Sequence, residues 1–136
     1  SKFLPIYIKN KLNTALGLRA GSQTGVYIIK EAGRFVYIGY SSSDLYKIFT
    51  RHFQSWQDRQ HRTTYGNRSS SRLTARVIFT SPLKAPKLEK ALVIKYQPRD
   101  NVNKYENYML DLKDREILKE ANDAEAFNFN NEPPPF

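Results

Sequence analysis

The sequence predicts one α+β domain in which an antiparallel sheet is flanked by helices. Two runs of β-branched and aromatic residues, 26–30 and 34–39, flank a short turn that contains Gly33. This pattern is typical of an antiparallel hairpin. Apolar residues recur at helical spacing on both sides of a third β-rich run, so the expected order is hairpin, helix, strand and helix. A chain of 136 residues has room for one such domain with a modest core.

The segments before and after this domain have a different character. Residues 1–24 are predicted to form an N-terminal extension that packs on the domain, with a short helix near residues 8–18. Residues 104–122 are predicted to hold an acidic-rich C-terminal helix, from Asp111 to Ala121. Residues 123–136 are acidic and end in three prolines and a phenylalanine, which predicts a disordered tail.

The elements after the hairpin follow from capping residues and periodicity. Serine and aspartate before position 45 can cap a helix from about Asp44 to Gln57. Residues Thr74 to Thr80 are predicted to form the third strand. A second helix is expected from Lys84 or Ala85 to Lys95, because the residue before Pro98 disfavours the helical conformation.

The composition excludes several classes of protein and of site. With no cysteine and only two histidines, the chain has no disulfide framework, no thiolate zinc site and no histidine cluster for a metal. Its 40% hydrophobic and 26% charged residues are typical of a folded domain. No apolar run approaches the ~20 residues that cross a bilayer. No signal segment opens the sequence, so we expect a cytoplasmic location.

The charge is unevenly distributed along the chain. Residues 1–99 carry 18 lysines and arginines against four acids, whereas residues 100–136 carry four against nine. A basic body indicates a polyanionic partner, with nucleic acid first and an anionic membrane second. The basic residues gather in a polar segment with no amphipathic helix, which disfavours the membrane. A basic surface that is merely solvated is the alternative.

Arginines gather between Arg51 and Arg76, where there are six, with no lysine and one acid. Arginine favours bidentate phosphate contacts and stacking. The insert from Asp58 to Arg72 interleaves charged and stacking groups, as nucleic-acid grooves do. The candidate nucleic-acid-binding residues are Lys47, Arg59, Arg62, Arg68, Arg72 and Arg76.

Two tyrosines stand on the two arms of the predicted hairpin, in the strings Gly25-Val26-Tyr27 and Tyr37-Ile38-Gly39. Pairing of the strands can bring both phenols close together. The glycine after Tyr37 lets a group approach the backbone closely. The alternative is an ordinary aromatic pair in the core.

Two further strings follow in order, Arg51-His52-Phe53 and the spaced pattern Glu89-x8-Pro98-x2-Asn101. Together with the tyrosine strings, they resemble the motifs of the GIY-YIG nuclease superfamily over about residues 25–103, and the chain resembles small stand-alone bacterial members. The resemblance implies a three-stranded antiparallel sheet flanked by helices. It also implies a DNA endonuclease, in repair or restriction, that hydrolyses phosphodiester bonds with one divalent cation, Mg²⁺ or Mn²⁺.

The resemblance also implies roles for individual residues. The expected catalytic residues are Tyr27, Tyr37, Arg51, His52, Glu89 and Asn101, with Glu89 holding the metal and Asn101 bracing the site. A single carboxylate suits a hard cation that keeps several waters and is completed by the substrate phosphate. The alternative for Glu89 is a surface salt bridge with Lys87 or Lys90.

The general base is expected to be a tyrosine. A free phenol, with a pKa near ~10, is a poor base at neutral pH. It must be activated by metal-bound water, by nearby cations or by His52 accepting its hydrogen bond. We expect Tyr27 as the base and Tyr37 as the positioning group, with the reverse assignment open. For His52 the alternative is a packed or capping histidine.

The chain departs from the family pattern at two positions. Most members carry an arginine four residues before His52, where this chain has Ile48, so Arg51 or Lys47 must replace it. Positions 48, 51 and 52 share a helix face, which favours Arg51. Repair members carry a lysine where this chain has Tyr40. The alternative function is therefore a nucleic-acid-binding module on a GIY-YIG scaffold with weak or lost catalysis.

The acidic residues before Pro135-Phe136 resemble the acidic C-terminal tip of bacterial single-stranded-DNA-binding proteins. That resemblance implies a repair-protein partner, or a tip that folds back onto the basic body. The alternative is an inert end of the chain.

Overall fold

The computed structural model describes residues 3–53, 65 and 72–128 and has the expected α+β architecture. Its main sheet contains β1 (Leu4–Pro5), β4 (Gly25–Glu31), β5 (Arg34–Ser41) and β6 (Leu73–Phe79). The order is β1-β6-β4-β5, and every neighbouring pair is antiparallel. The three predicted strands are confirmed, and β1 adds a fourth, two-residue strand at the edge of β6.

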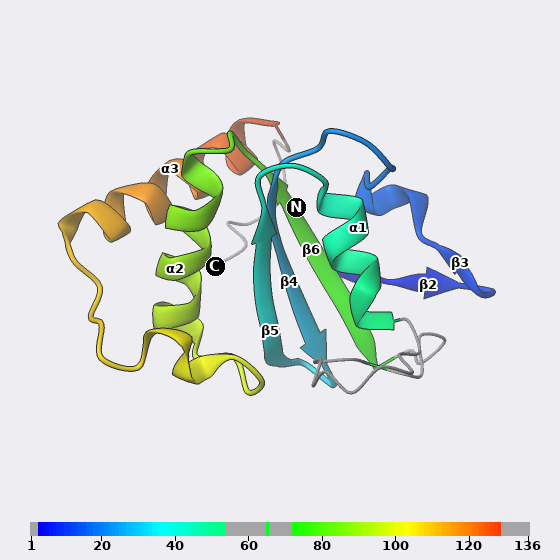
Figure 1. Ribbon diagram of the computed structural model, residues 1–136, viewed down its shortest axis with the longest axis horizontal. Coiled ribbons are helices and arrows are strands. Elements are labelled where there is room, and N and C mark those ends of the chain that lie inside the picture. Colours follow the sequence, from blue (N-terminus) through cyan, green and yellow to red (C-terminus); the bar gives the residue numbers. More distant parts are fainter. Residues whose placement is uncertain (1–2, 54–64, 66–71, 129–136) are drawn as a thin grey trace.

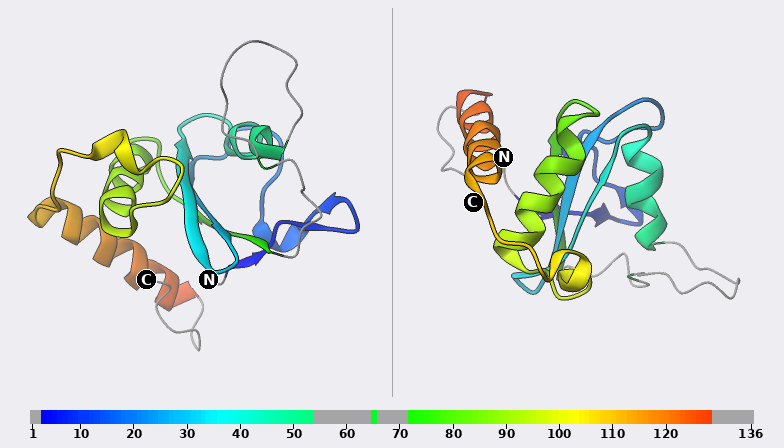
Figure 2. Two further views of the ribbon diagram at one scale, coloured as in Figure 1. Left: turned by 90° about the horizontal axis from the view of Figure 1, so that it is seen from below. Right: turned by 60° about the vertical axis from the view of Figure 1, so that its left-hand side comes forward.

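The sheet separates two helical layers (Figures 1 and 2). The short helix α1 (Leu45–Thr50) covers one face, whereas α2 (Lys84–Tyr96) and α3 (Leu112–Asn128) lie on the other. Alternate residues of a strand point to opposite faces. One side of β4 therefore packs into a core with α1, and the other packs into a core with α2 and α3.

The N-terminal segment differs from its prediction. In place of a helix near residues 8–18, β2 (Tyr7–Ile8) pairs with β3 (Lys11–Leu12), and a single 3-10 turn, η1 (Thr14–Leu16), follows. Lys9 and Asn10 both have positive φ angles, 51° and 67°, which suit the tight turn of a two-residue hairpin and break a helix. The buried side chain of Leu16 belongs to the core beneath α1.

The first helix is shorter than predicted within the described residues. Asp44 caps it, since its carboxylate accepts a hydrogen bond from the backbone N–H of Lys47. After Thr50 the chain tightens into a 3-10 turn, η2 (Arg51–Phe53). The remainder of the predicted helix, residues 54–57, lies outside the described residues, as does all of the arginine-rich insert except Tyr65 and Arg72.

The second helix agrees with its prediction, and the third extends beyond it. Helix α2 ends at Tyr96 and is capped by Gln97, whose φ of 50° places it in the left-handed region, directly before Pro98. Helix α3 continues to Asn128, so residues 123–128 are helical where a disordered tail was expected. No proline interrupts this stretch, and its alanines and glutamate favour helix. Residues 129–136, with the Pro-Phe tip, lie outside the described residues. No helix in the described part is long and apolar enough to cross a membrane.

Candidate active site at the edge of the sheet

The hairpin brings the two tyrosines together. Their rings are nearly parallel, with an interplanar angle of 10° and 6.1 Å between centroids. Tyr27 pairs with Gly39 across the two strands, and its phenol lies directly over that glycine. A Cβ atom at position 39 would lie 2.3 Å from the phenol oxygen, so the glycine of the Tyr-Ile-Gly string is required by packing.

His52 meets both tyrosines from the η2 turn. Its Nε2 lies 2.7 Å from the phenol oxygen of Tyr27, and its ring centroid is 4.4 Å from that of Tyr37. Burial, reinforced by the negative charges that Tyr37, Glu89 and Tyr65 can carry, raises the pKa of the Tyr27 phenol well above its usual value. Tyr27 is therefore protonated at neutral pH, and its phenol shares a hydrogen bond with Nε2 of His52. A hydrogen bond between this phenol and His52 is the contact expected from the sequence for a histidine that activates the tyrosine.

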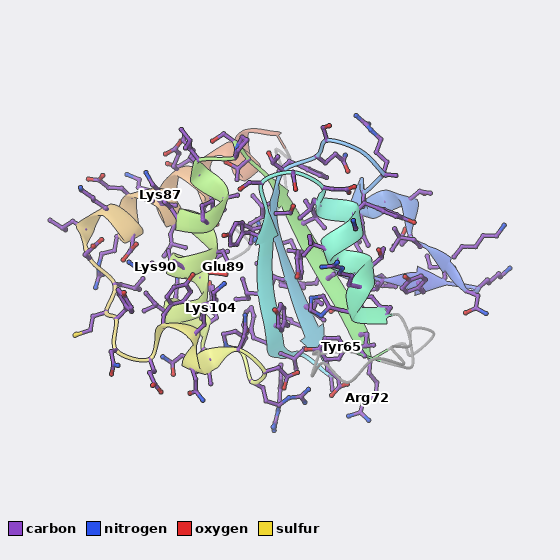
Figure 3. The ribbon with its side chains drawn as sticks, viewed as in Figure 1. Tyr65, Arg72, Lys87, Glu89, Lys90 and Lys104 are labelled. Atoms are coloured by element: carbon purple, nitrogen blue, oxygen red, sulfur yellow. The ribbon has the colours of Figure 1, made fainter. Side chains whose placement is uncertain are left out.

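Glu89 extends from α2 and is completely buried, with 0% of its side chain exposed. Its carboxylate makes an ion pair with Lys104 of η3 (Val102–Tyr105), at 2.6 Å between Oε2 and Nζ. The alternative of a surface salt bridge with Lys87 or Lys90 is wrong (Figure 3). Residues one and two positions away on a helix do not face each other, which explains why neither lysine reaches the carboxylate.

The carboxylate is electrostatically coupled to the tyrosines. The charge of Glu89 contributes to raising the pKa of both Tyr27 and Tyr37, although burial is the main cause in each case. Burial, followed by a hydrogen bond to Glu89, also raises the pKa of the Tyr105 phenol. The tyrosine pair belongs to the α1 layer and Glu89 to the α2 layer, so the site extends around the edge strand β5.

Asn101 holds that edge strand in place. Its Nδ2 donates to the carbonyl oxygen of Ile38 at 2.6 Å, and its Oδ1 accepts from the Ile38 N–H at 3.4 Å. Ile38 lies between Tyr37 and Gly39, so the side chain of Asn101 fixes the strand at the residues that form the site. These hydrogen bonds are compatible with the bracing role that the resemblance implied for Asn101, which stays a prediction.

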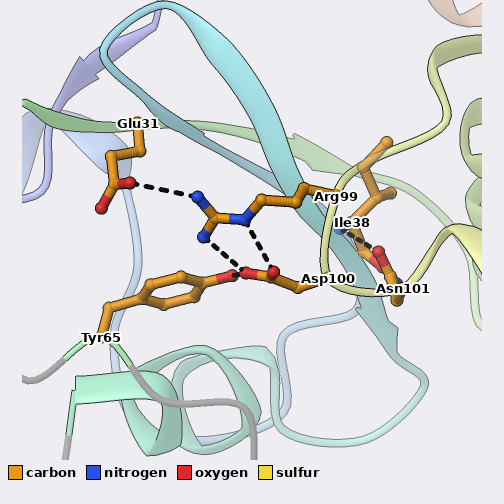
Figure 4. A network of polar contacts seen from close by, with 6 residues as sticks. All are labelled: Glu31, Ile38, Tyr65, Arg99, Asp100 and Asn101. Atoms are coloured by element: carbon orange, nitrogen blue, oxygen red, sulfur yellow. Dashed lines mark hydrogen bonds and ion pairs between the residues drawn. The ribbon is translucent and has the colours of Figure 1, made fainter.

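A polar network that the sequence did not reveal connects Tyr65 to the same edge (Figure 4). The Tyr65 phenol donates to Asp100 at 2.6 Å, and its backbone N–H donates to the carbonyl of His52 at 2.5 Å. Arg99 forms a bidentate pair with Asp100, at 2.8 and 2.9 Å, and also reaches Glu31. The hydrogen bonds from Arg99 and Tyr65 lower the pKa of the Asp100 carboxyl, against its partial burial. The string Pro98-Arg99-Asp100-Asn101 is the feature of the sequence that could have indicated this network.

The candidate nucleic-acid-binding residues fall into three groups. Lys47 and Arg72 are exposed, as is Arg51 on the η2 turn. Arg76 is 0% exposed within β6, on the side that packs against α2, so its assignment as a surface phosphate contact is corrected. Alternation along the strand places position 76 on the same buried face as Ile78. The surface assignment of Arg76 rested on its charge and did not take this alternation into account. The others, Arg59, Arg62 and Arg68, lie outside the described residues.

The site residues fit a single hard cation. No group of three or more histidine, cysteine, aspartate or glutamate side chains gathers among the described residues, so a site built wholly from protein ligands is absent there. The second carboxylate oxygen of Glu89, Oε1, is buried and has no hydrogen-bond partner among the described residues. A buried, unpaired anionic oxygen is costly unless a cation or another partner meets it. One carboxylate, with water and a phosphate to complete the shell, suits Mg²⁺.

The family model of the GIY-YIG catalytic domain matches residues 23–115, which is more than half of the chain. The chain belongs to this family. GIY-YIG domains are typically endonucleases that hydrolyse phosphodiester bonds and generally use divalent metals. The match covers the hairpin, the η2 turn, Glu89 and Asn101 together. A search of curated proteins found no match.

The two departures from the GIY-YIG pattern have structural counterparts. Ile48, at the position of the family arginine, is partly buried against the core under α1. Tyr40, at the position of the repair members' lysine, has its ring 5.5 Å from the ammonium of Lys104. The GIY-YIG site of this chain thus has a positive charge beside Tyr40, but Lys104 of η3 supplies it.

Proposed function

We propose that the protein is a DNA endonuclease that depends on one divalent metal ion, Mg²⁺ or Mn²⁺, held by Glu89. The observation that carries the proposal is a hydrogen-bonded Tyr27–His52 pair that is electrostatically coupled to a fully buried carboxylate with an unpartnered oxygen, across the edge strand β5. A packed aromatic core alone requires neither the buried acid nor the buried histidine.

The raised pKa of Tyr27 determines how the tyrosine can act. A buried phenol with a raised pKa does not lose its proton to solvent at neutral pH. The phenol oxygen can take a proton from the attacking water only as its own proton passes to His52 Nε2, which is 2.7 Å away. His52 thus becomes the cation, and Tyr27 remains neutral throughout. Tyr37, stacked on Tyr27 and in contact with His52, positions both groups.

The other residues serve the phosphate and the strand. A divalent cation at Glu89 supplies charge that stabilises the phosphate and the leaving oxygen. Arg51 is exposed on the turn that carries His52 and is our replacement for the arginine missing at Ile48, with Lys47 one helical turn earlier as the second candidate. Asn101 keeps Ile38, and with it Tyr37 and Gly39, at a fixed position along β5.

The DNA surface is proposed to extend from the exposed face of α1 and η2 to the arginine-rich insert. Lys47, Arg51 and Arg72 are exposed there in the described part of the chain. The Tyr65 phenol donates to Asp100, so this residue of the insert lies beside the proposed catalytic edge. Contacts to phosphates position a nucleic acid without reading its sequence.

The second candidate function is a DNA-binding module that has weak or no catalysis. The absence of an arginine at Ile48 favours it, because the partly buried isoleucine cannot contact a phosphate. Both functions predict binding that weakens steeply with salt. Only catalysis separates them.

The test is Mg²⁺-dependent cleavage of duplex, branched and single-stranded DNA by the wild-type chain and by Glu89→Gln. Glu116→Gln on the exposed surface of α3 is the matched control, since it removes the same charge from a solvent-exposed position on a different helix. We expect cleavage by the wild type and the control and none by Glu89→Gln. Equal cleavage by Glu89→Gln would remove Glu89 from the mechanism. Salt-dependent binding without cleavage of any substrate would favour the second function.

A further inference from the structure

We propose that the ammonium of Lys104 occupies the cation position of Glu89 in the metal-free protein, and that a divalent metal ion binds Glu89 by displacing it. This inference rests on the proposed function, which assigns the metal to Glu89. It gives a role in metal binding to Lys104, which belongs to none of the motif strings, although it lies within the matched residues 23–115.

The burial of the two partners differs in a way that suits displacement. The Glu89 side chain is 0% exposed, whereas the Lys104 side chain is 46% exposed. The ammonium lies 2.6 Å from Oε2, a short distance typical of a charge-assisted hydrogen bond. A partner that itself reaches solvent can swing out, and its departure opens the buried Oε2 to an incoming ion.

The surroundings of the ammonium are those of a cation site. The rings of Tyr40 and Tyr105 each have their centroid 5.5 Å from Nζ, within the range in which an aromatic ring attracts a cation. The positive charge of Lys104 also lowers the pKa of Tyr37, against the larger effect of burial. The position of Lys104 therefore already places a positive charge where it acts on the Tyr37 phenol.

Competition follows from electrostatics. A metal ion on either oxygen of Glu89 and the ammonium on Oε2 would lie only a few ångströms apart on one carboxylate, where two positive charges repel each other strongly. The protein must hold a buried carboxylate when no metal is present, and pairing it with Lys104 avoids an isolated buried charge. Metal binding then costs free energy, because the ion must first break the pair between Glu89 and Lys104. The apparent metal affinity is thus lower than that of the same carboxylate without Lys104.

The test is calorimetric titration of Mn²⁺ into the metal-free protein, without DNA. Lys104→Met removes the ammonium, and Lys90→Met is the matched control. Lys90 neighbours Glu89 in sequence, but its ammonium lies over the Tyr108 ring instead. Hydrogen bonds to charged groups contribute enough for a ten- to hundredfold change, and the exposure of Lys104 favours the lower end of that range. We expect Lys104→Met to bind Mn²⁺ about tenfold more tightly and Lys90→Met to bind it as the wild type does.

A second measurement follows the thermal unfolding midpoint. Metal-free Lys104→Met should melt below the wild type, because Glu89 is left as a buried unpaired charge, and Mn²⁺ should raise its midpoint more than that of the wild type. If Lys104→Met does not fold, Lys104→Gln keeps a hydrogen-bond donor without the charge, and the same tighter binding is expected.

Glu89→Gln separates the failure of this inference from that of the proposed function. If Mn²⁺ binds the wild type through Glu89 and removal of the lysine charge leaves the affinity unchanged or weaker, Lys104 does not compete, and the inference alone is overturned. If neither the wild type nor the lysine variants bind Mn²⁺ in a manner that Glu89→Gln abolishes, both the inference and the metal site of the proposed function are overturned.

Discussion

Replacing Gly39 with alanine tests the packing of the Tyr27 phenol over β5. The added Cβ would lie 2.3 Å from the phenol oxygen and 2.4 Å from Cζ, both far shorter than van der Waals contact. The Tyr27 ring has no free space into which it could move, since Tyr27 is 1% exposed and its phenol is hydrogen-bonded to His52. The ring must therefore shift, and the phenol must leave Nε2.

The magnitude follows from two contributions. Forcing extra volume into a packed core costs about 1–3 kcal/mol. Leaving the buried phenol and imidazole unpaired costs about 1–3 kcal/mol more, although relaxation of the strand makes the two contributions overlap. The φ angle of Gly39 lies outside the left-handed region, so alanine adds no backbone strain. We expect Gly39→Ala to lower the free energy of unfolding by about 2–4 kcal/mol.

Urea denaturation followed by circular dichroism measures this cost in two backgrounds. In a Tyr27→Leu chain the aromatic ring is gone, so Gly39→Ala should cost less than about 1 kcal/mol there. Gly33→Ala is the control, because it has open space but a φ of 79°. Its cost, about 1–2 kcal/mol from backbone strain, should be the same in both backgrounds. An equal cost of Gly39→Ala with and without the Tyr27 ring would refute the reasoning.

Three further predictions follow from the site and its surroundings. Tyr27→Phe should destabilise the fold by only about 1–2 kcal/mol but lower DNA cleavage at least about a hundredfold, and unchanged cleavage would contradict the proton relay. Arg72→Ala should reduce the salt slope of DNA binding by about one, whereas Arg76→Met, at a buried position, should leave that slope unchanged. Because the folded pKa of Asp100 is lowered, mainly by Arg99, its stabilising effect is full above about pH 5 and is lost as the pH falls through that pKa. Asp100→Asn should therefore destabilise the chain at pH 7 and not at pH 2.

The hairpin and α2 could be predicted from the sequence because their signals are local. Alternation of β-branched and aromatic residues around Gly33 predicted strands within one or two residues of β4 and β5. The restriction that Pro98 places on the preceding residue predicted the end of α2 to within one residue. These patterns depend on neighbours in sequence, so tertiary contacts did not override them.

The N-terminal segment shows why other elements could not be predicted. A strand of two residues has no periodicity of its own, and β1 exists only because Leu4 pairs with Ala75 across the molecule. The apolar residues between positions 4 and 18 match helical spacing equally well in isolation. The choice is decided by the positive φ angles at Lys9 and Asn10 and by the burial of Leu16, and these depend on packing against the sheet.

For the site, the motifs predicted a set of residues whose roles stay predictions, and they did not indicate which charges those residues meet. Nearness in sequence suggested Lys87 and Lys90 as partners of Glu89, although helix geometry turns both away from it. Lys104, fifteen residues on, forms the pair. Likewise, charge alone suggested that Arg76 is on the surface, whereas strand alternation puts it inside.

The spacing between Glu89 and Asn101 has a geometric meaning that the motif alone does not express. Helix α2 runs beside the edge strand, and the left-handed residue Gln97 turns the chain back toward it. The backbone N–H groups of Arg99 and Asp100 then donate to the carbonyls of Phe35 and Val36, and Asn101 continues along β5 to Ile38. An exposed strand edge needs such a cover. The segment that covers the edge therefore also fixes the distance between the carboxylate on one face of the sheet and the tyrosines on the other. Inserting one residue between Pro98 and Asn101 should change this distance and abolish DNA cleavage, while the hairpin and both cores still form.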